Sequence, residues 1–185
     1  MLGSGVTMAQ SLPWINPTLP PAQRLALLVS ATTLAQMEEQ MHGQSGTIPE
    51  VPSYGNGGRH VPGIPALDIQ TFRISISNGP VGVSQGDCTP VAKATATVTS
   101  LGLAASFDPT QATACGNLVG TEATDVGVEV IERPGMDMAR IPQGGRNFEY
   151  MGEDPFLTGP MAAPHVQAMR SHGVIGMSKR FVAND

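Results

Sequence analysis

The amino-acid sequence predicts an α/β fold in which parallel strands alternate with crossover helices. Beyond residue 70, short apolar or β-branched runs alternate with longer helical ones. Two helix starts are also marked by an aspartate directly before a proline. A chain of 185 residues is long enough for one domain with a sizeable core. We therefore expect one α/β domain, or part of one.

The N-terminal third is expected to be irregular and then helical. Residues 1–20 show no periodicity and are interpreted as an irregular lead-in to a domain covering 21–185. Between 22 and 42, apolar residues recur near helical spacing, and Thr33 resembles a cap within the run. This pattern predicts one broken helix or two. The Gly- and Pro-rich segment 43–65 predicts a long loop.

The remainder of the chain is expected to contain about four βα units. The predicted strands are 71–76, 103–106, 128–132 and 174–177, and the predicted helices are 92–101, 109–126 and 155–172. Asp108 and Asp154 each precede a proline in the first helical turn, where its missing N–H costs nothing, so both are expected to be helix caps. Pro164 is expected to kink or break the last helix.

Clusters of polar residues follow three of the predicted strands. SISNGP, ERPGMDMARIPQGGRNFEY and MSKRFVAND each begin at the C-terminal end of a strand. In a (β/α)8 barrel of typically ~250 residues, that end is the active-site face. Four units amount to about half of such a barrel, so we expect a partial barrel, truncated at the C-terminus. Its unpaired sheet edges favour self-association.

Composition and charge exclude several classes of partner. A net charge of -5, a pI near 5.3 and scattered cations disfavour nucleic acid. No apolar run approaches the ~20 residues that span a bilayer, and the N-terminus lacks a signal core, so no membrane partner is expected. Cys88 and Cys115 are expected to be free thiols. The four histidines lack metal-ligand spacing, and no metal is expected.

The stretch GGRNFEYMGEDPFLTGP, from Gly144 to Pro160, packs an arginine, three carboxylates and aromatic residues between glycines and a proline. With IERPGMDMARIP before it and HGVIGMSKRFVAND after it, this stretch resembles the N-terminal catalytic domain of glycoside hydrolase family 3. The resemblance extends to AASFDP, GTEATDVGVEVIERPGMDMAR and LTGPMAA, from about Leu25 to Asp185. It implies a retaining β-glucosidase-type enzyme that hydrolyses terminal β-linked sugars and requires no cofactor. The implied partner is a small saccharide or β-glycoside.

The same resemblance implies four substrate-binding residues. Arg146 matches the family arginine that contacts the sugar. Lys179 and Arg180 align with a Lys-His pair that bonds sugar hydroxyls, so an arginine stands here in the place of the histidine. Asn78 falls where many members carry the aspartate of Asp-Gly-Pro. The residues alone leave an alternative interpretation open for each of them. In that interpretation Arg146 only braces nearby acids, Lys179 and Arg180 are solvated cations, and Asn78 belongs to a turn.

Three acids of the central stretch have two interpretations. Glu149, Glu153 and Asp154 include a candidate carboxylate pair for glycoside hydrolysis. Alternatively, Asp154 caps a helix, Glu149 pairs with Arg146 or Arg140, and Glu153 lies on the surface.

The resemblance favours the second interpretation. It implies that the nucleophilic aspartate lies downstream, in a Ser-Asp-Trp type motif absent after Val174, and that the acid/base residue lies further on. No catalytic residue is therefore expected in this chain, which we expect to be inactive alone. A non-catalytic carbohydrate-binding or pseudoenzyme module is the alternative.

Overall fold

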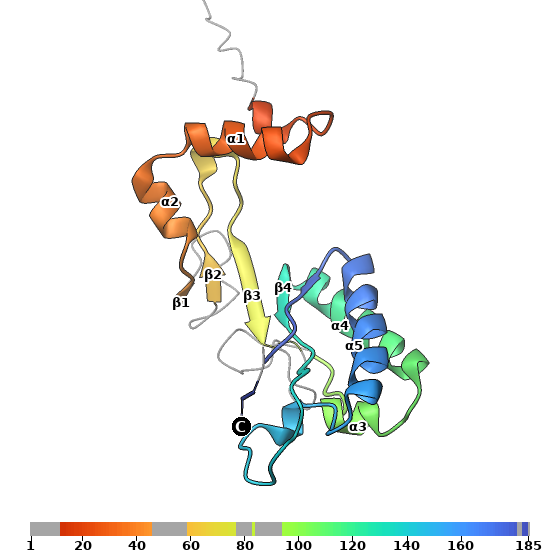
Figure 1. Ribbon diagram of the computed structural model, residues 1–185. Helices are drawn as coiled ribbons and strands as arrows, with labels where there is room; N and C mark the ends of the chain where they lie inside the picture. The colour runs from red at the N-terminus through yellow and green to blue at the C-terminus, as the bar shows by residue number, and fades with distance from the viewer. Residues whose placement is uncertain (1–11, 46–58, 77–82, 84–93, 181–182, 185) are drawn as a thin grey trace, which may run out of the picture. The chain divides into compact units, whose positions relative to one another are not determined.

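The computed structural model describes residues 12–45, 59–76, 83, 94–180 and 183–184 (Figure 1). The chain forms two compact units. One, the helical unit, comprises Met1–Gly43 and Val61–Thr71. The other, the sheet unit, comprises Gln44–His60 and Phe72–Asp185.

The helical unit is held together by hydrogen bonds between its turns and helices. Its elements are the short 3-10 helices η1 (Pro13–Ile15) and η3 (Pro65–Leu67) and the helices α1 (Pro21–Ala31) and α2 (Leu34–Gln40). Trp14 Nε1 donates to the carbonyl oxygen of Leu67 at 3.0 Å, and Arg24 Nε donates to the carbonyl oxygen of Trp14 at 2.6 Å. The first of these bonds joins segments that are far apart in the sequence, and the second ties α1 to the turn before it.

The break between α1 and α2 confirms the prediction of a broken helix. The break lies at Thr32 and Thr33, where Thr33 Oγ1 accepts a hydrogen bond from the Gln36 backbone at 3.3 Å. The Gln36 side chain in turn accepts from the Thr33 backbone N–H at 2.9 Å. This capping box satisfies donors that the first turn of a helix leaves unpaired.

The sheet has five strands in the order β1-β2-β3-β4-β5. Their bounds are Gln44–Ser45, Arg59–Val61, Phe72–Ile76, Val130–Glu132 and Ile175–Gly176. β1 is antiparallel to β2, whereas β3, β4 and β5 are parallel. The predicted strands at 71–76, 128–132 and 174–177 are thus confirmed. The loop predicted for 43–65 is wrong at Gln44–Ser45 and Arg59–Val61, because these residues form the paired strands β1 and β2. These strands lack the apolar pattern from which a strand is predicted.

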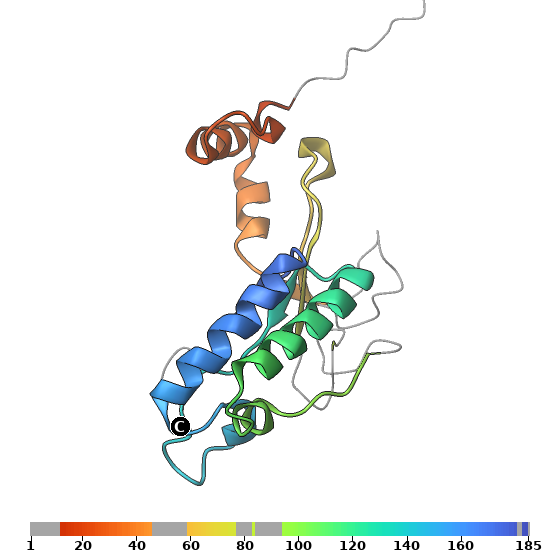
Figure 2. The same cartoon turned by 90° about the vertical axis from the view of Figure 1, so that its right-hand side faces the viewer.

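Two long helices cover one face of the sheet (Figure 2). α4 (Pro109–Asp125) lies between β3 and β4 in the sequence, and α5 (Pro155–Ser171) lies between β4 and β5. The helices pack side by side. Gly116 permits this close contact, because a Cβ at this position would overlap the carbonyl oxygen of His165. The helices predicted at 109–126 and 155–172 are confirmed.

The strand predicted at 103–106 is wrong, because Leu103 and Ala104 belong to the short helix α3 (Ser100–Ala104) and residues 105–106 form the turn that follows it. Thr99 caps this helix through Oγ1, which accepts from the Gly102 backbone at 3.0 Å. Leu103 and Ala104 are buried, and so short an apolar run does not distinguish a strand from a helix. The helix predicted at 92–101 is also wrong over 94–99, where no helix forms.

Both predicted aspartate caps are confirmed. Asp108 Oδ1 accepts from the Thr110 backbone at 2.9 Å, and Asp154 Oδ1 accepts from the Phe156 backbone at 2.8 Å. Hydrogen bonds from the Thr110 side chain and backbone hold the pKa of Asp108 below its ordinary value. The carboxylates therefore fix the starts of the two long helices.

The break predicted at Pro164 is wrong, because α5 continues through both Pro160 and Pro164. The buried face of α5 packs into the core. Such packing is the dominant source of stability for a helix in a protein. That core comprises Val83, Val119, Ala123, Val128, Ile131, Met169 and Val174 in one cluster and Leu103, Ala104, Ala112, Met151, Met161 and Ala162 in another. Packing thus compensates for the backbone bonds that the prolines remove.

Candidate functional site

The carboxyl ends of the parallel strands carry a cluster of charged side chains. Glu132 is the last residue of β4, and Lys179 follows shortly after β5. The 3-10 helix η5 (Asn147–Glu149) lies beyond the carboxyl end of β3 (Figure 1). In open α/β sheets, ligands bind at this edge. The position of the cluster therefore agrees with the polar segments expected after the strands.

Glu149 provides a buried carboxylate at the centre of the cluster, with a side chain only 2% exposed. Its Oε1 lies 2.6 Å from a terminal nitrogen of Arg146. Its Oε2 lies 3.5 Å from Lys179 Nζ and 3.4 Å from a terminal nitrogen of Arg180. A buried charge is stable only when it is paired. Glu149 therefore brings together three of the four predicted substrate-binding residues.

The backbone around Gly135 explains why Glu149 and Lys179 meet. A Cβ on Gly135 would overlap the carbonyl oxygen of Glu149, so glycine allows the segment after β4 to approach η5. Gly135 also forms a parallel bridge with Lys179, whose N–H donates to the carbonyl oxygen of Pro134 at 2.9 Å. The η5 turn is closed by the Glu149 N–H, which donates to the carbonyl oxygen of Arg146 at 2.8 Å.

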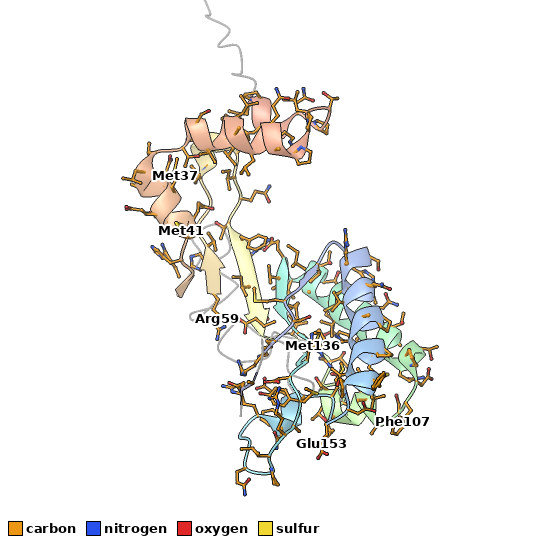
Figure 3. All side chains as sticks on the ribbon, in the orientation of Figure 1. Met37, Met41, Arg59, Phe107, Met136 and Glu153 are labelled. Carbon is orange, nitrogen blue, oxygen red and sulfur yellow. The ribbon has the colours of Figure 1, made fainter. Side chains whose placement is uncertain are left out.

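Lys179 lies between two carboxylates. Its Nζ is 3.9 Å from Glu132 Oε2 and 3.5 Å from Glu149 Oε2, and its side chain is 12% exposed. Glu132 also forms an ion pair with Arg59, the first residue of β2, which Figure 3 labels. Arg59 and Glu132 were not among the residues predicted from the sequence. An acid at the carboxyl end of a predicted strand was an available signal for Glu132, but Arg59 lay in a segment interpreted as a loop.

Arg180 has donor capacity that the described residues do not use. Within the described part of the chain, its guanidinium donates to Glu149 alone, through a terminal nitrogen at 3.4 Å. Its Nε is buried and has no hydrogen-bond partner among the described residues. A buried unsatisfied donor is costly, so each such group requires an explanation.

A second group of contacts fixes the chain just beyond this cluster. The Asn184 N–H donates to Asp137 Oδ2 at 2.6 Å, and Asn184 Nδ2 donates to the Tyr150 hydroxyl oxygen at 2.7 Å. Desolvation raises the pKa of Asp137. The hydrogen bonds from Asn184, Met138 and Arg140 outweigh it and hold that pKa below its ordinary value. Asp137 is therefore an ionised anchor for the segment after Arg180.

The acids of the central stretch follow the second of the two interpretations. Glu149 pairs with Arg146, Asp154 caps α5, and Glu153 is exposed at the position labelled in Figure 3. The oxygens of Glu149 are occupied by cations. This arrangement suits a carboxylate that orients other groups better than one that attacks a substrate.

Several predictions concern residues or groups beyond this cluster. Asn78 and Cys88 lie outside the described residues. Cys115 is a free thiol. Within the described ranges, no group of three His, Cys, Asp or Glu side chains is arranged to hold a metal ion. Within the same ranges, no helix is both long and apolar enough to cross a membrane.

Fold and site together describe an α/β protein with a charged cluster at the carboxyl edge of its parallel strands. Residues 80–185 match the family described as the glycosyl hydrolase family 3 N terminal domain. Beta-glucosidase BoGH3A of Bacteroides ovatus is 33% identical over 147 residues, covering 72% of this chain and 19% of that protein. Exo-alpha-(1->6)-L-arabinopyranosidase of Bifidobacterium longum is 32% identical over 149 residues, covering 75% and 19%. The chain therefore belongs to glycosyl hydrolase family 3.

Solved structures agree with this assignment. Beta-glucosidase 3B of Thermotoga neapolitana, in complex with alpha-D-glucose, superposes with a TM-score of 0.72 at 27% identity, covering 87% of this chain and 23% of that one. DesR, a beta-glucosidase of Streptomyces venezuelae in complex with D-glucose, gives 0.70 at 28% identity, covering 87% and 19%. The α/β fold class and the interpretation as a partial (β/α)8 barrel domain are confirmed. The chain spans about a fifth or less of the length of the curated relatives it matches.

Proposed function

We propose that this chain is the sugar-positioning part of a β-glucosidase-type glycoside hydrolase that cleaves terminal β-linked sugars with retention. Family membership supports the reaction class. The observation that carries the proposal is the convergence of Arg146, Lys179 and Arg180 on the buried Glu149 at the carboxyl edge of the sheet. Such a set of fixed donors orients a polyhydroxylated ligand.

Each cation has a distinct role in this proposal. Arg146 is half exposed, so its guanidinium fork reaches a pair of sugar hydroxyls while one nitrogen stays on Glu149. Lys179 is fixed between Glu132 and Glu149 and directs its remaining N–H groups at a further hydroxyl. Arg180 occupies a third position. By family resemblance, Asn78 supplies a fourth contact.

The chemistry itself requires two further carboxyl groups. A retaining glycosidase uses one as the nucleophile, which forms a covalent glycosyl intermediate, and the other as the acid/base. Glu149 is committed to its cations and Glu153 is exposed, so neither fits these roles. We place both catalytic groups in parts of the enzyme beyond this chain. Orienting the sugar before attack is the contribution of the residues described here.

Calorimetric titration of the 185-residue chain with glucose, together with an aryl β-glycoside assay, tests this function. We expect glucose binding without turnover. Arg146→Ala and Lys179→Ala are expected to weaken binding by about tenfold or more, as charge-assisted hydrogen bonds are lost. Arg170→Ala is the matched control, because Arg170 is an exposed arginine in the last turn of α5.

Two results would contradict the proposal. If neither Arg146→Ala nor Lys179→Ala changes the affinity for glucose, the sugar does not bind at this cluster. Turnover of the aryl β-glycoside by the chain alone would return the catalytic role to Glu149 or Glu153. If a protein containing this chain and all its other domains binds sugars but hydrolyses none, the carbohydrate-binding alternative is favoured.

A further inference from the structure

The ion-pair network at the carboxyl edge contains more cations than carboxylates. In the described part of the chain, four cations and two carboxylates are linked by contacts of 4 Å or less: Arg59, Arg146, Lys179 and Arg180 with Glu132 and Glu149. The cations thus exceed the carboxylates by two. A buried or half-buried excess of one charge attracts a ligand of the opposite charge.

The exposures of these side chains show which charges a ligand would meet. The carboxylates are the inner members, with side chains 15% exposed for Glu132 and 2% for Glu149. The arginines are the outer members, at 44% for Arg59, 51% for Arg146 and 25% for Arg180. A molecule that approaches this edge therefore meets guanidinium groups.

Arg180 supplies an independent observation. Its Nε is buried and lacks a hydrogen-bond partner among the described residues, and its contact with Glu149 is long, at 3.4 Å. An arginine carries five N–H donors in a planar fork that matches a carboxylate with two parallel bonds. Glu149 already receives Arg146 and Lys179, so it does not satisfy this fork.

We propose that the site takes an acidic sugar, namely a terminal β-linked hexuronide whose C6 carboxylate is bound by Arg180 with its neighbouring cations. This inference rests on the proposed function, because it names the substrate class of the same site. One additional carboxylate, the nucleophile that a retaining reaction requires, still leaves one cation in surplus. Among the described residues, a neutral sugar leaves that charge uncompensated and offers the Arg180 Nε only neutral hydroxyl acceptors.

The test compares two ligands that differ only at C6, methyl β-D-glucuronide and methyl β-D-glucoside, at constant ionic strength with the 185-residue chain. Binding is followed by NMR, through the arginine Nε–H resonances. The glucuronide is expected to bind about tenfold more tightly, because charge-assisted bonds are roughly twice as strong as neutral ones. Its binding, unlike that of the glucoside, weakens as salt is added. Sodium acetate is expected to produce no saturable shift.

Arg180→Gln and Arg180→His are expected to reduce the preference for the glucuronide over the glucoside by about tenfold. Arg170→Gln, which changes an exposed arginine of α5, is expected to leave the preference unchanged. The unmodified chain alone already tests the proposal if a variant does not fold.

An equal or higher affinity for the glucoside overturns the acidic-sugar inference and leaves the proposed function intact. An equal response to acetate also overturns it, whereas binding of neither sugar overturns the proposed function as well.

Discussion

Glu149 and Arg133 are both buried charged residues of the sheet unit, but their surroundings differ. Glu149 is contacted by cations that extend to the solvent. Arg133 is 2% exposed, and its guanidinium contacts Thr97 Oγ1 at 3.4 Å and Cys115 Sγ at 3.5 Å. Burial lowers the pKa of Arg133. The charge on Glu149 therefore connects to the surface, whereas the charge on Arg133 is enclosed.

His165 belongs to the same enclosed group of residues as Arg133, Thr97 and Cys115, which we call the Arg133 cluster. Its side chain is fully buried between α4 and α5, and its Nδ1 lies 3.2 Å from the carbonyl oxygen of Ala112. Burial, with a smaller contribution from the charge of Arg133, lowers the pKa of His165 to about 3. The exposures of the two clusters differ, and we propose that the Glu149 cluster serves binding, whereas the Arg133 cluster affects stability and its dependence on pH.

The largest effect expected is an acid destabilisation caused by His165. The native state keeps this imidazole neutral, whereas the unfolded chain binds a proton below the ordinary histidine pKa of 6.5. As the pH is lowered from 6.5 to about 3, the free energy of unfolding should therefore decrease by about 1.4 kcal/mol per pH unit. Urea denaturation across this range measures the slope. His165→Gln removes the titration, so an unchanged slope in that variant would contradict the assignment.

Glu149→Ala should cost about 3 kcal/mol of stability, because it leaves the partly buried Lys179 and Arg180 without their shared carboxylate. The measurement is the free energy of unfolding in urea. Glu153→Ala is the control, because this exposed acid should change stability by less than about 0.5 kcal/mol. Equal effects of the two substitutions would show that Glu149 is no more important than a surface acid.

Gly116→Val should disturb the enclosed cluster without altering a charge. Its side chain would overlap the backbone of His165 and the Cβ of Ala168, and overpacking typically costs about 1–3 kcal/mol. Thermal denaturation measures the loss. Gly159→Ala is the control, because a Cβ at Gly159 meets no atom within 4 Å. Sugar affinity should remain unchanged in folded Gly116→Val, and a selective loss of affinity would contradict the separation of the two clusters.

Arg146→Lys should produce the smallest effect on stability and a specific effect on binding. Lysine retains the charge next to Glu149 but lacks the planar fork, so stability should change by less than about 1 kcal/mol. Affinity for glucose should fall by about tenfold, as measured by titration. Arg170→Lys should change neither quantity. An affinity equal to that of the unmodified chain would mean that the charge alone of Arg146 suffices.

The elements that were predictable from the sequence are those with strong local signals. Asp108 and Asp154 marked the starts of α4 and α5 through capping, which depends on neighbouring residues alone. Strands β1 and β2 were not predictable, because their pairing joins short polar segments. The 103–106 run was misassigned because its few apolar residues fit either periodicity.

The site shows the same division. Arg146, Lys179 and Arg180 were identified because they lie in motifs with a family resemblance, and the structure brings all three to Glu149. Arg59 was missed because its contact with Glu132 links residues that are distant in sequence. Neither local composition nor motif spacing encodes such a contact.

The most direct test of sugar binding at the Glu149 cluster is an NMR titration of the 185-residue chain with glucose, followed at the side-chain nitrogens. We predict saturable shifts for Arg146 and Lys179, whereas Arg73, which pairs with Glu129 away from the cluster, stays unchanged. A chain that folds with the Glu149 contacts intact but shows no shift at Arg146 or Lys179 would contradict a sugar-positioning role for these residues.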